Sequence, residues 1–98
     1  MKAYLCKFIP PRADFLATMT VDEAKWMKQH GEFLDDLLAE GIVVAHGPVM
    51  DPSGGYGVSL YQIDDDQNIE AITSQDPIVR NGAGHYEHHP MRHLAARG

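Results

Sequence analysis

The sequence predicts an α+β fold whose elements follow the order strand, helix, strand, strand, helix, strand. Three observations carry this prediction: β-forming side chains at residues 3–9, one long helical pattern at 20–41, and later apolar runs separated by glycine, proline and aspartate. The 98 residues are enough for one compact domain and too few for two. We expect a domain at residues 1–92 and a C-terminal tail at 93–98.

The first strand and the first helix have the clearest signals. Two consecutive prolines end the strand at residues 3–9, because proline cannot donate to a sheet ladder. Residues 12–19 are expected to form a connecting loop. Thr20 followed by Glu23 has the spacing of a capping box, which marks the start of a helix. Apolar side chains then recur at helical spacing until Gly41, a residue typical of helix ends.

The rest of the chain predicts three further strands and a shorter helix. The strands are expected at residues 42–45, 58–63 and 86–89, and the helix at residues 69–72. This order is the ferredoxin-like, or split-βαβ, pattern: an antiparallel sheet with both helices packed on one face. The first strand carries apolar side chains on both faces, so the face without helices needs a cover. A second subunit laid sheet to sheet would supply it.

Composition and charge exclude several classes of function. Eight basic against fourteen acidic residues give a net charge of −6, which repels phosphates, so we expect no nucleic-acid partner. No stretch approaches the roughly 18 apolar residues of a membrane span, and the N-terminus lacks the apolar centre of a signal peptide. Cys6 is the single cysteine and cannot form an internal disulfide. We expect a cytoplasmic protein that does not contact membranes.

His30 and Asp76 are the first candidates for chemistry. His30 falls among the apolar positions of the long helix, so its ring should face the sheet. It is either a core histidine that donates to a carbonyl or a general acid and base, for which a pKa near ~6.5 is well suited. Asp76 precedes Pro77, which is typical of a helix N-cap; the other interpretation makes Asp76 the partner of His30. Spacing does not decide whether the two side chains meet.

Gly47 and Pro48 are candidates for shaping a binding site. Such a pair usually stops a strand, and we expect the second strand to end there. Glycine also allows a ligand to approach the backbone closely, so the pair could border a pocket. Asp51 and Tyr56, in the loop that follows, are candidates for lining that pocket. The alternative for both is an ordinary solvated loop.

His85, Glu87 and His89 alternate along the last expected strand and would share one of its faces. Imidazoles and a carboxylate on one face are able to bind zinc or another divalent ion. Their spacing matches no recognised metal motif, and a solvated strand face explains them equally well. We therefore predict no metal site and no cofactor.

Three segments together resemble the YCII-related (YciI-like) family. They are residues 26–34 (WMKQHGEFL), residues 41–48 (GIVVAHGP), and the pair Asp76-Pro77 followed by Gly82. The resemblance implies a dimeric α+β barrel, in which two ferredoxin-like sheets face each other. It also implies an active site built on a histidine–aspartate pair, which corresponds here to His30 and Asp76. One branch of the family is associated with dehydrochlorination of chlorinated hydroxyquinols, and related barrels include lactone isomerases and small monooxygenases.

The sequence and the resemblance lead to one main functional hypothesis and one competitor. The main hypothesis is a homodimeric, cofactor-independent enzyme, of the lyase or isomerase type, that transfers a proton on a small cyclic or aromatic molecule. His30 would move the proton and Asp76 would orient the imidazole. The competitor is a non-catalytic ligand-binding or regulatory module that uses the same cavity.

Overall fold

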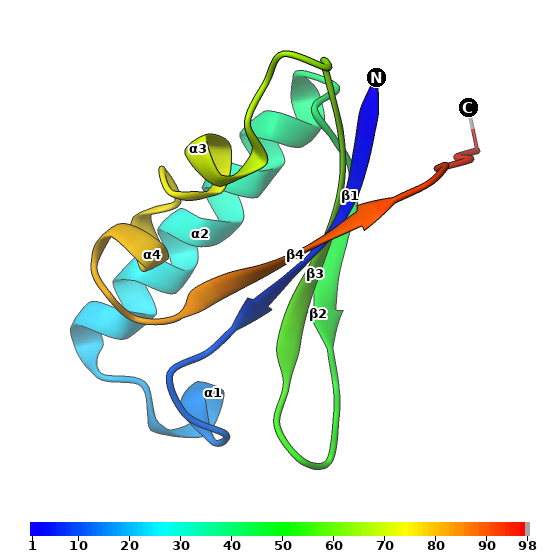
Figure 1. Cartoon of the computed structure of the whole chain (residues 1–98). Helices are drawn as coiled ribbons and strands as arrows, with labels where there is room; N and C mark the ends of the chain where they lie inside the picture. Colours follow the sequence, from blue (N-terminus) through cyan, green and yellow to red (C-terminus); the bar gives the residue numbers. More distant parts are fainter. Residues whose placement is uncertain (98) are drawn as a thin grey trace.

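The computed structural model describes residues 1–97, which form an antiparallel sheet of four strands with the helices on one side (Figure 1). The strands lie in the order β2-β3-β1-β4. The elements are β1 (Lys2–Ile9), α1 (Phe15–Thr18), α2 (Val21–Ala39), β2 (Val43–Val49), β3 (Tyr56–Ile63), α3 (Ile69–Thr73), α4 (Pro77–Arg80) and β4 (His85–Met91). The predicted ferredoxin-like fold and its element order are confirmed.

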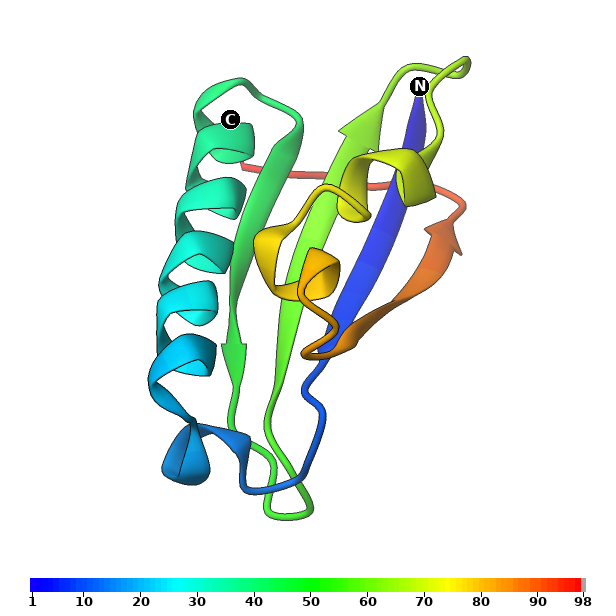
Figure 2. The same cartoon turned by 90° about the vertical axis from the view of Figure 1, so that its left-hand side faces the viewer.

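Helix α2 is the long element that covers the β2 side of the sheet, with α3 and α4 beside it (Figure 2). Its predicted capping box is present: Glu23 N–H donates to Thr20 Oγ1 at 3.1 Å, and Thr20 N–H donates to Glu23 Oε1 at 2.9 Å. Gly41 follows the helix with φ of +79°, a conformation that glycine adopts without strain. Within residues 1–97, no helix has the length and apolar character needed to cross a membrane.

The second predicted helix is divided into two short helices. Helix α3 begins after Asn68, whose side chain accepts hydrogen bonds from two backbone N–H groups of the first turn. The chain then turns, and Asp76-Pro77 starts α4 as a new helix. The predicted loop at 12–19 also contains one helical turn, α1, which buries Phe15. Short turns of this kind depend on what they pack against, so periodicity alone does not define them.

The prediction that Gly47-Pro48 ends the second strand is wrong. Strand β2 continues to Val49, with Gly47 opposite Val58 and Pro48 opposite Gly57 on β3. Proline is tolerated because β2 is an edge strand, where one side of the backbone needs no ladder partner. Edge position depends on the order of strands in space, so it could not be inferred from the local sequence.

The core lies between the sheet and the helices. On β1, Cys6 and Phe8 face the helices, whereas Leu5 and Lys7 face the open side. Burial raises the pKa of the Cys6 thiol to about 12, so it stays protonated and unreactive, as expected of a small core residue. The open side remains partly apolar, since Leu5 lies beside Leu60 of β3. The buried apolar residues are Cys6, Phe8, Phe15, Leu34, Val43, Tyr61, Ile63, Ile69, Ile78 and Ala83.

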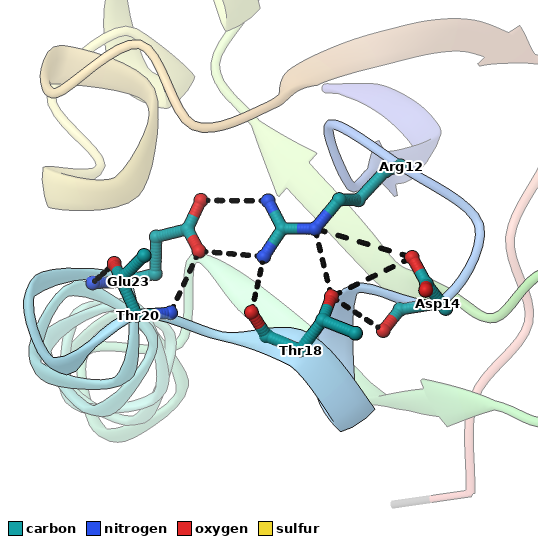
Figure 3. Close-up of polar contacts among 5 residues, drawn as sticks. All are labelled: Arg12, Asp14, Thr18, Thr20 and Glu23. Carbon is teal, nitrogen blue, oxygen red and sulfur yellow. Dashed lines mark hydrogen bonds and ion pairs between the residues drawn. The ribbon is translucent and has the colours of Figure 1, made fainter.

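Arg12 forms hydrogen bonds that link the segment containing α1 to the start of α2 (Figure 3). Its guanidinium donates to both carboxylate oxygens of Glu23, at 2.9 and 2.7 Å, and also to the side chain and backbone carbonyl of Thr18. A bidentate pair of this kind has a defined geometry. Because Glu23 also belongs to the capping box, its carboxylate stabilises the start of α2 and also binds the preceding segment through Arg12.

Glu23→Gln is expected to remove a pH-dependent contribution to stability. The hydrogen bonds from Arg12 are the largest cause that lowers the pKa of Glu23 from 4.5 to about 2. A carboxylate with a depressed folded-state pKa stabilises the fold above its unfolded pKa, and that stability is lost as pH falls through the folded pKa. Wild type should therefore melt above the variant at neutral pH, and the difference should shrink as pH falls from 4.5 towards about 2. A constant difference in thermal melts across this range would contradict this role.

Candidate active site

His30 and Asp76 meet beneath the helices, although 46 residues separate them in the sequence. His30 comes from the middle of α2, and Asp76 is the residue that starts α4. The His30 Nδ1 atom lies 2.6 Å from Asp76 Oδ2. His30 is 8% exposed and Asp76 is 0% exposed, so the contact is screened from solvent. The packing of α2 against α4 brings the pair together.

The two oxygens of Asp76 have different partners. Oδ1 accepts a hydrogen bond from the Ile78 N–H at 3.2 Å, the ordinary bond of a helix N-cap. Oδ2 contacts His30 and also accepts from the Tyr86 hydroxyl at 2.6 Å. The N-cap interpretation and the histidine-partner interpretation of Asp76 are therefore both satisfied by the same side chain. Three elements, α2, α4 and β4, converge on this carboxylate.

Tyr86 is a member of this cluster that the sequence analysis did not select as a site residue. Burial is the main cause that raises the pKa of Tyr86, and the neighbouring Asp76 carboxylate raises it further, so the hydroxyl remains a donor. Tyr86 lies opposite Phe8 of β1, and the Phe8 ring centroid is 4.9 Å from that of His30. Alternation along β4 places Tyr86 on the face opposite to His85, Glu87 and His89, but it does not identify the partner of the hydroxyl. These contacts hold the imidazole between an aromatic ring and a carboxylate.

A cavity of about 450 Å³ reaches His30. It lies between the α1 segment, the middle of α2, the end of β2 and the start of β3, and most of its wall is apolar. Asp76 is not part of the wall and supports His30 from behind. The side chains and glycines that border the cavity include Phe8, Phe15, Leu16, Met27, His30, Gly31, Leu34, His46, Gly47, Pro48, Val49, Tyr56, Val58, Ser59 and Tyr86. A mostly apolar chamber with a few polar side chains, His30 among them, is an arrangement suited to binding a small organic molecule.

Three of the four predicted pocket residues lie at this cavity. Gly47, Pro48 and Tyr56 border it, although Gly47 and Pro48 do so from within a strand. Asp51 does not border it: its Oδ1 accepts from the backbone N–H and the hydroxyl of Ser53 in the exposed β2–β3 turn. Asp51 is therefore a residue of the turn and not of the cavity wall.

Gly31 leaves part of the cavity open. A Cβ atom at this position would meet no other atom of residues 1–97 within 4 Å, apart from neighbouring backbone of its own helix. Glycine inside a helix is unfavourable compared with alanine, so its presence beside His30 needs another reason. Space for a ligand against the helix backbone is such a reason.

Gly31→Ala is expected to raise the free energy of unfolding by about 0.5–1 kcal/mol, because alanine favours the helix. The added side chain would occupy the cavity, so ligand affinity should fall, and Gly31→Leu should lower it further. Urea unfolding and titration with hydroquinone measure the two effects. The matched control is Gly41→Ala, which is strained at φ of +79° and should lower stability without changing affinity. If Gly31→Leu binds hydroquinone as well as wild type, the cavity is not the binding site.

The candidate metal residues lie elsewhere. His85, Glu87 and His89 share the open face of β4, opposite Ile9, Lys7 and Leu5 of β1. His89 Nε2 is 3.7 Å from Glu87 Oε1, and both side chains are about half exposed. Across the part of the chain that the structure describes, no group of three or more histidine, cysteine, aspartate or glutamate residues is arranged to hold a metal ion.

A family model for the YCII-related domain matches residues 3–94. The chain belongs to this family. No curated protein sequence matches the chain.

Among the solved structures that share the fold are two enzymes. One is 5-chloro-2-hydroxyhydroquinone dehydrochlorinase (TftG) from Burkholderia phenoliruptrix AC1100, in complex with 2,5-dihydroxybenzoquinone: TM-score 0.67, 11% identity, covering 96% of this chain and 95% of that chain. The other is a mutant of SnoaB, a cofactor-independent oxygenase from Streptomyces nogalater: TM-score 0.51, 10% identity, covering 97% and 94%. At these identities the likeness shows the fold alone; by their names, one relative is a dehydrochlorinase and the other an oxygenase.

Proposed function

We propose that this YCII-related protein is an enzyme that moves a proton on a small one-ring organic molecule, with His30 as the acid and base. The observation that carries the proposal is a buried imidazole that has a carboxylate 2.6 Å from one nitrogen and borders a cavity. An ionised carboxylate only accepts hydrogen bonds, so Nδ1 carries the proton of the neutral ring. Nε2 is then the basic nitrogen that is free to react with a ligand.

The proposed step starts from a ligand in the cavity and a neutral His30. Nε2 takes a proton from a C–H or O–H bond, whose electron pair stays on the ligand. The imidazolium that forms lies against the Asp76 carboxylate, which stabilises its charge and fixes its orientation. Return of the proton to another atom completes an isomerisation, and departure of an anion such as chloride completes an elimination. Neither outcome oxidises or reduces the ligand overall, so the proposed step uses no cofactor.

One of the solved relatives supports a hydroxylated one-ring compound as the ligand. The name of TftG describes removal of hydrogen chloride from a hydroxylated ring, and its structure contains a one-ring quinone. A cavity of about 450 Å³ admits a molecule of that size. The apolar rings of Phe8 and Phe15 would cover the faces of such a ligand and reduce its contact with water.

Two assays test the proposal. In the first, the protein is mixed with 5-chloro-2-hydroxyhydroquinone and chloride release is followed; in the second, hydroxylated one-ring compounds are incubated in D₂O and exchange of ring hydrogens is followed by NMR. We expect acceleration above the buffer rate in at least one assay. If neither reaction is accelerated while the same compounds bind, the protein is the non-catalytic ligand-binding module of the competing hypothesis.

We also propose that the open face of the sheet pairs with a second copy of the chain. Leu5 and Leu60 lie side by side on that face and are only partly buried. Apolar side chains on an uncovered sheet favour association. The mass of the protein in solution, measured by light scattering, should be that of a homodimer; a monomer at the concentrations used for the assays would contradict this.

A further inference from the structure

The cavity has a second histidine–carboxylate pair in its wall. His46 of β2 places Nε2 2.8 Å from Asp35 Oδ1 of α2, and His46 borders the cavity. The Asp35 side chain is 69% exposed, so this pair lies at the edge of the sheet, unlike the buried His30–Asp76 pair. With Nε2–H donating to the carboxylate, Nδ1 of the neutral ring is an acceptor. Nδ1 forms no hydrogen bond within residues 1–97.

Ser59 supplies an independent observation at the same place. It lies directly opposite His46 in the β2–β3 register and also borders the cavity. Ser59 is 1% exposed, and its hydroxyl has no hydrogen-bond partner among the described residues. Buried hydroxyls without partners are rare, because the lost hydration is not replaced. A polar group of a bound ligand would provide the missing partner.

Tyr61 provides a comparison for Ser59. Its hydroxyl is the other buried side-chain oxygen of the described chain without a partner, and it lies on the same face of β3 as Ser59. Burial is the main cause that raises the pKa of Tyr61, and the Ser59 side chain opposes that rise, so the two hydroxyls are neighbours although they do not form a full hydrogen bond. Tyr61 does not border the cavity, whereas Ser59 does. Tyr61 is therefore a matched control for Ser59.

We propose that Ser59 and His46 form a second ligand-binding group, which recognises a hydroxyl substituent on the same ring that His30 acts upon. The Ser59 hydroxyl donates to the oxygen of that substituent, and His46 Nδ1 accepts its hydrogen. Both partners are satisfied by a hydroxyl, whereas a methyl ether offers no hydrogen to His46. This inference rests on the proposed function for the use of the cavity, and it narrows the ligand to one-ring compounds with at least two oxygen substituents.

The test compares dihydroxybenzenes with their monomethyl ethers in equilibrium titrations followed by NMR. Hydroquinone and resorcinol should bind with Kd values of roughly 1 mM, as expected for fragments of this size. Each should bind about fivefold more tightly than 4-methoxyphenol or 3-methoxyphenol, the effect of about one hydrogen bond. His46→Ala should reduce this preference to nearly one, whereas Ser59→Ala should weaken the binding of each compound about fivefold, because hydroxyl and ether oxygens both accept from Ser59.

Stability measurements separate a binding role from a structural one. Ser59→Ala removes a hydroxyl without a partner, so the variant should melt at or above the wild-type temperature. Tyr61→Phe should do the same and should keep the full preference for dihydroxybenzenes. The inference is overturned if no dihydroxybenzene binds, if His46→Ala keeps the preference, if Ser59→Ala binds the dihydroxybenzenes as tightly as wild type does, or if Tyr61→Phe loses the preference.

Failure of the second binding group and failure of the enzyme proposal give different experimental results. The preference is a ratio of affinities and does not depend on turnover. If proton transfer is absent but the preference disappears in His46→Ala and the affinity falls in Ser59→Ala, the second binding group stands and the enzyme proposal fails. If proton transfer depends on His30 but His46→Ala keeps the preference and Ser59→Ala keeps the affinity, the enzyme proposal stands and the second binding group fails.

Discussion

Replacing His30 with glutamine is expected to lower turnover by about 10²–10⁴-fold, the usual contribution of a positioned acid or base. The glutamine amide can still donate to Asp76, so the buried carboxylate keeps a partner. It has no nitrogen that takes up a proton near neutral pH. The loss should therefore appear in the rate of chloride release or of deuterium exchange, with little change in the melting temperature.

The matched control for this variant is His93→Gln, since His93 is exposed and lies beyond the last strand. It should keep wild-type turnover. If folded His30→Gln retains most of its activity on a compound that wild type converts, His30 is not the acid or base, and its contact with Asp76 is structural.

Asp76→Ala is expected to be the most destabilising single change, at about 3–5 kcal/mol. It removes the N-cap of α4 and leaves a backbone N–H, the Tyr86 hydroxyl and the His30 Nδ1–H without their acceptor. A domain of this size has a total stability of about 5–15 kcal/mol, so the variant should be close to unfolding. Urea unfolding followed by circular dichroism measures the loss.

Two controls separate the causes of that loss. Asn68→Ala removes the side-chain cap of α3, which is exposed, and should lower stability by only about 1 kcal/mol. Asp76→Asn keeps an oxygen for the cap but brings an amide donor near Tyr86 and His30, so its loss should lie between the other two. If Asp76→Ala is no more destabilising than Asn68→Ala, the buried carboxylate contributes only as a cap.

The fold could be predicted because its signals are local. The capping box at Thr20 and Glu23 and the helical period that ends at Gly41 define α2 without reference to the rest of the chain. The end of β2 could not be predicted, because proline at Pro48 is acceptable only on an edge strand. The division between α3 and α4 likewise depends on packing against the sheet.

The candidate site was predicted in part. His30 was placed correctly on the buried side of α2, and Asp76 was recognised as a helix cap, but their contact depends on the packing of α2 against α4. The roles of Tyr86, His46 and Ser59 need the strand register, which side-chain alternation does not give. One local feature of the sequence does mark the cavity wall.

That feature is Gly31, the residue after His30. Glycine inside an otherwise favourable helix lowers its stability, so its position next to the candidate acid or base indicates that space is needed there. In the structure, Gly31 borders the cavity. Inspection of such glycines in helices that carry a candidate histidine would identify cavity walls from sequence.

The most direct measurement is the protonation of the His30 ring nitrogens, observed by ¹⁵N NMR with and without hydroquinone. We predict a neutral ring that carries its proton on Nδ1, bonded to Asp76, and an unprotonated Nε2 whose resonance moves when the ligand binds. A ring protonated on Nε2 alone, or an Nε2 resonance that a bound ligand leaves unchanged, would contradict the assignment of His30 as the proton-transfer group.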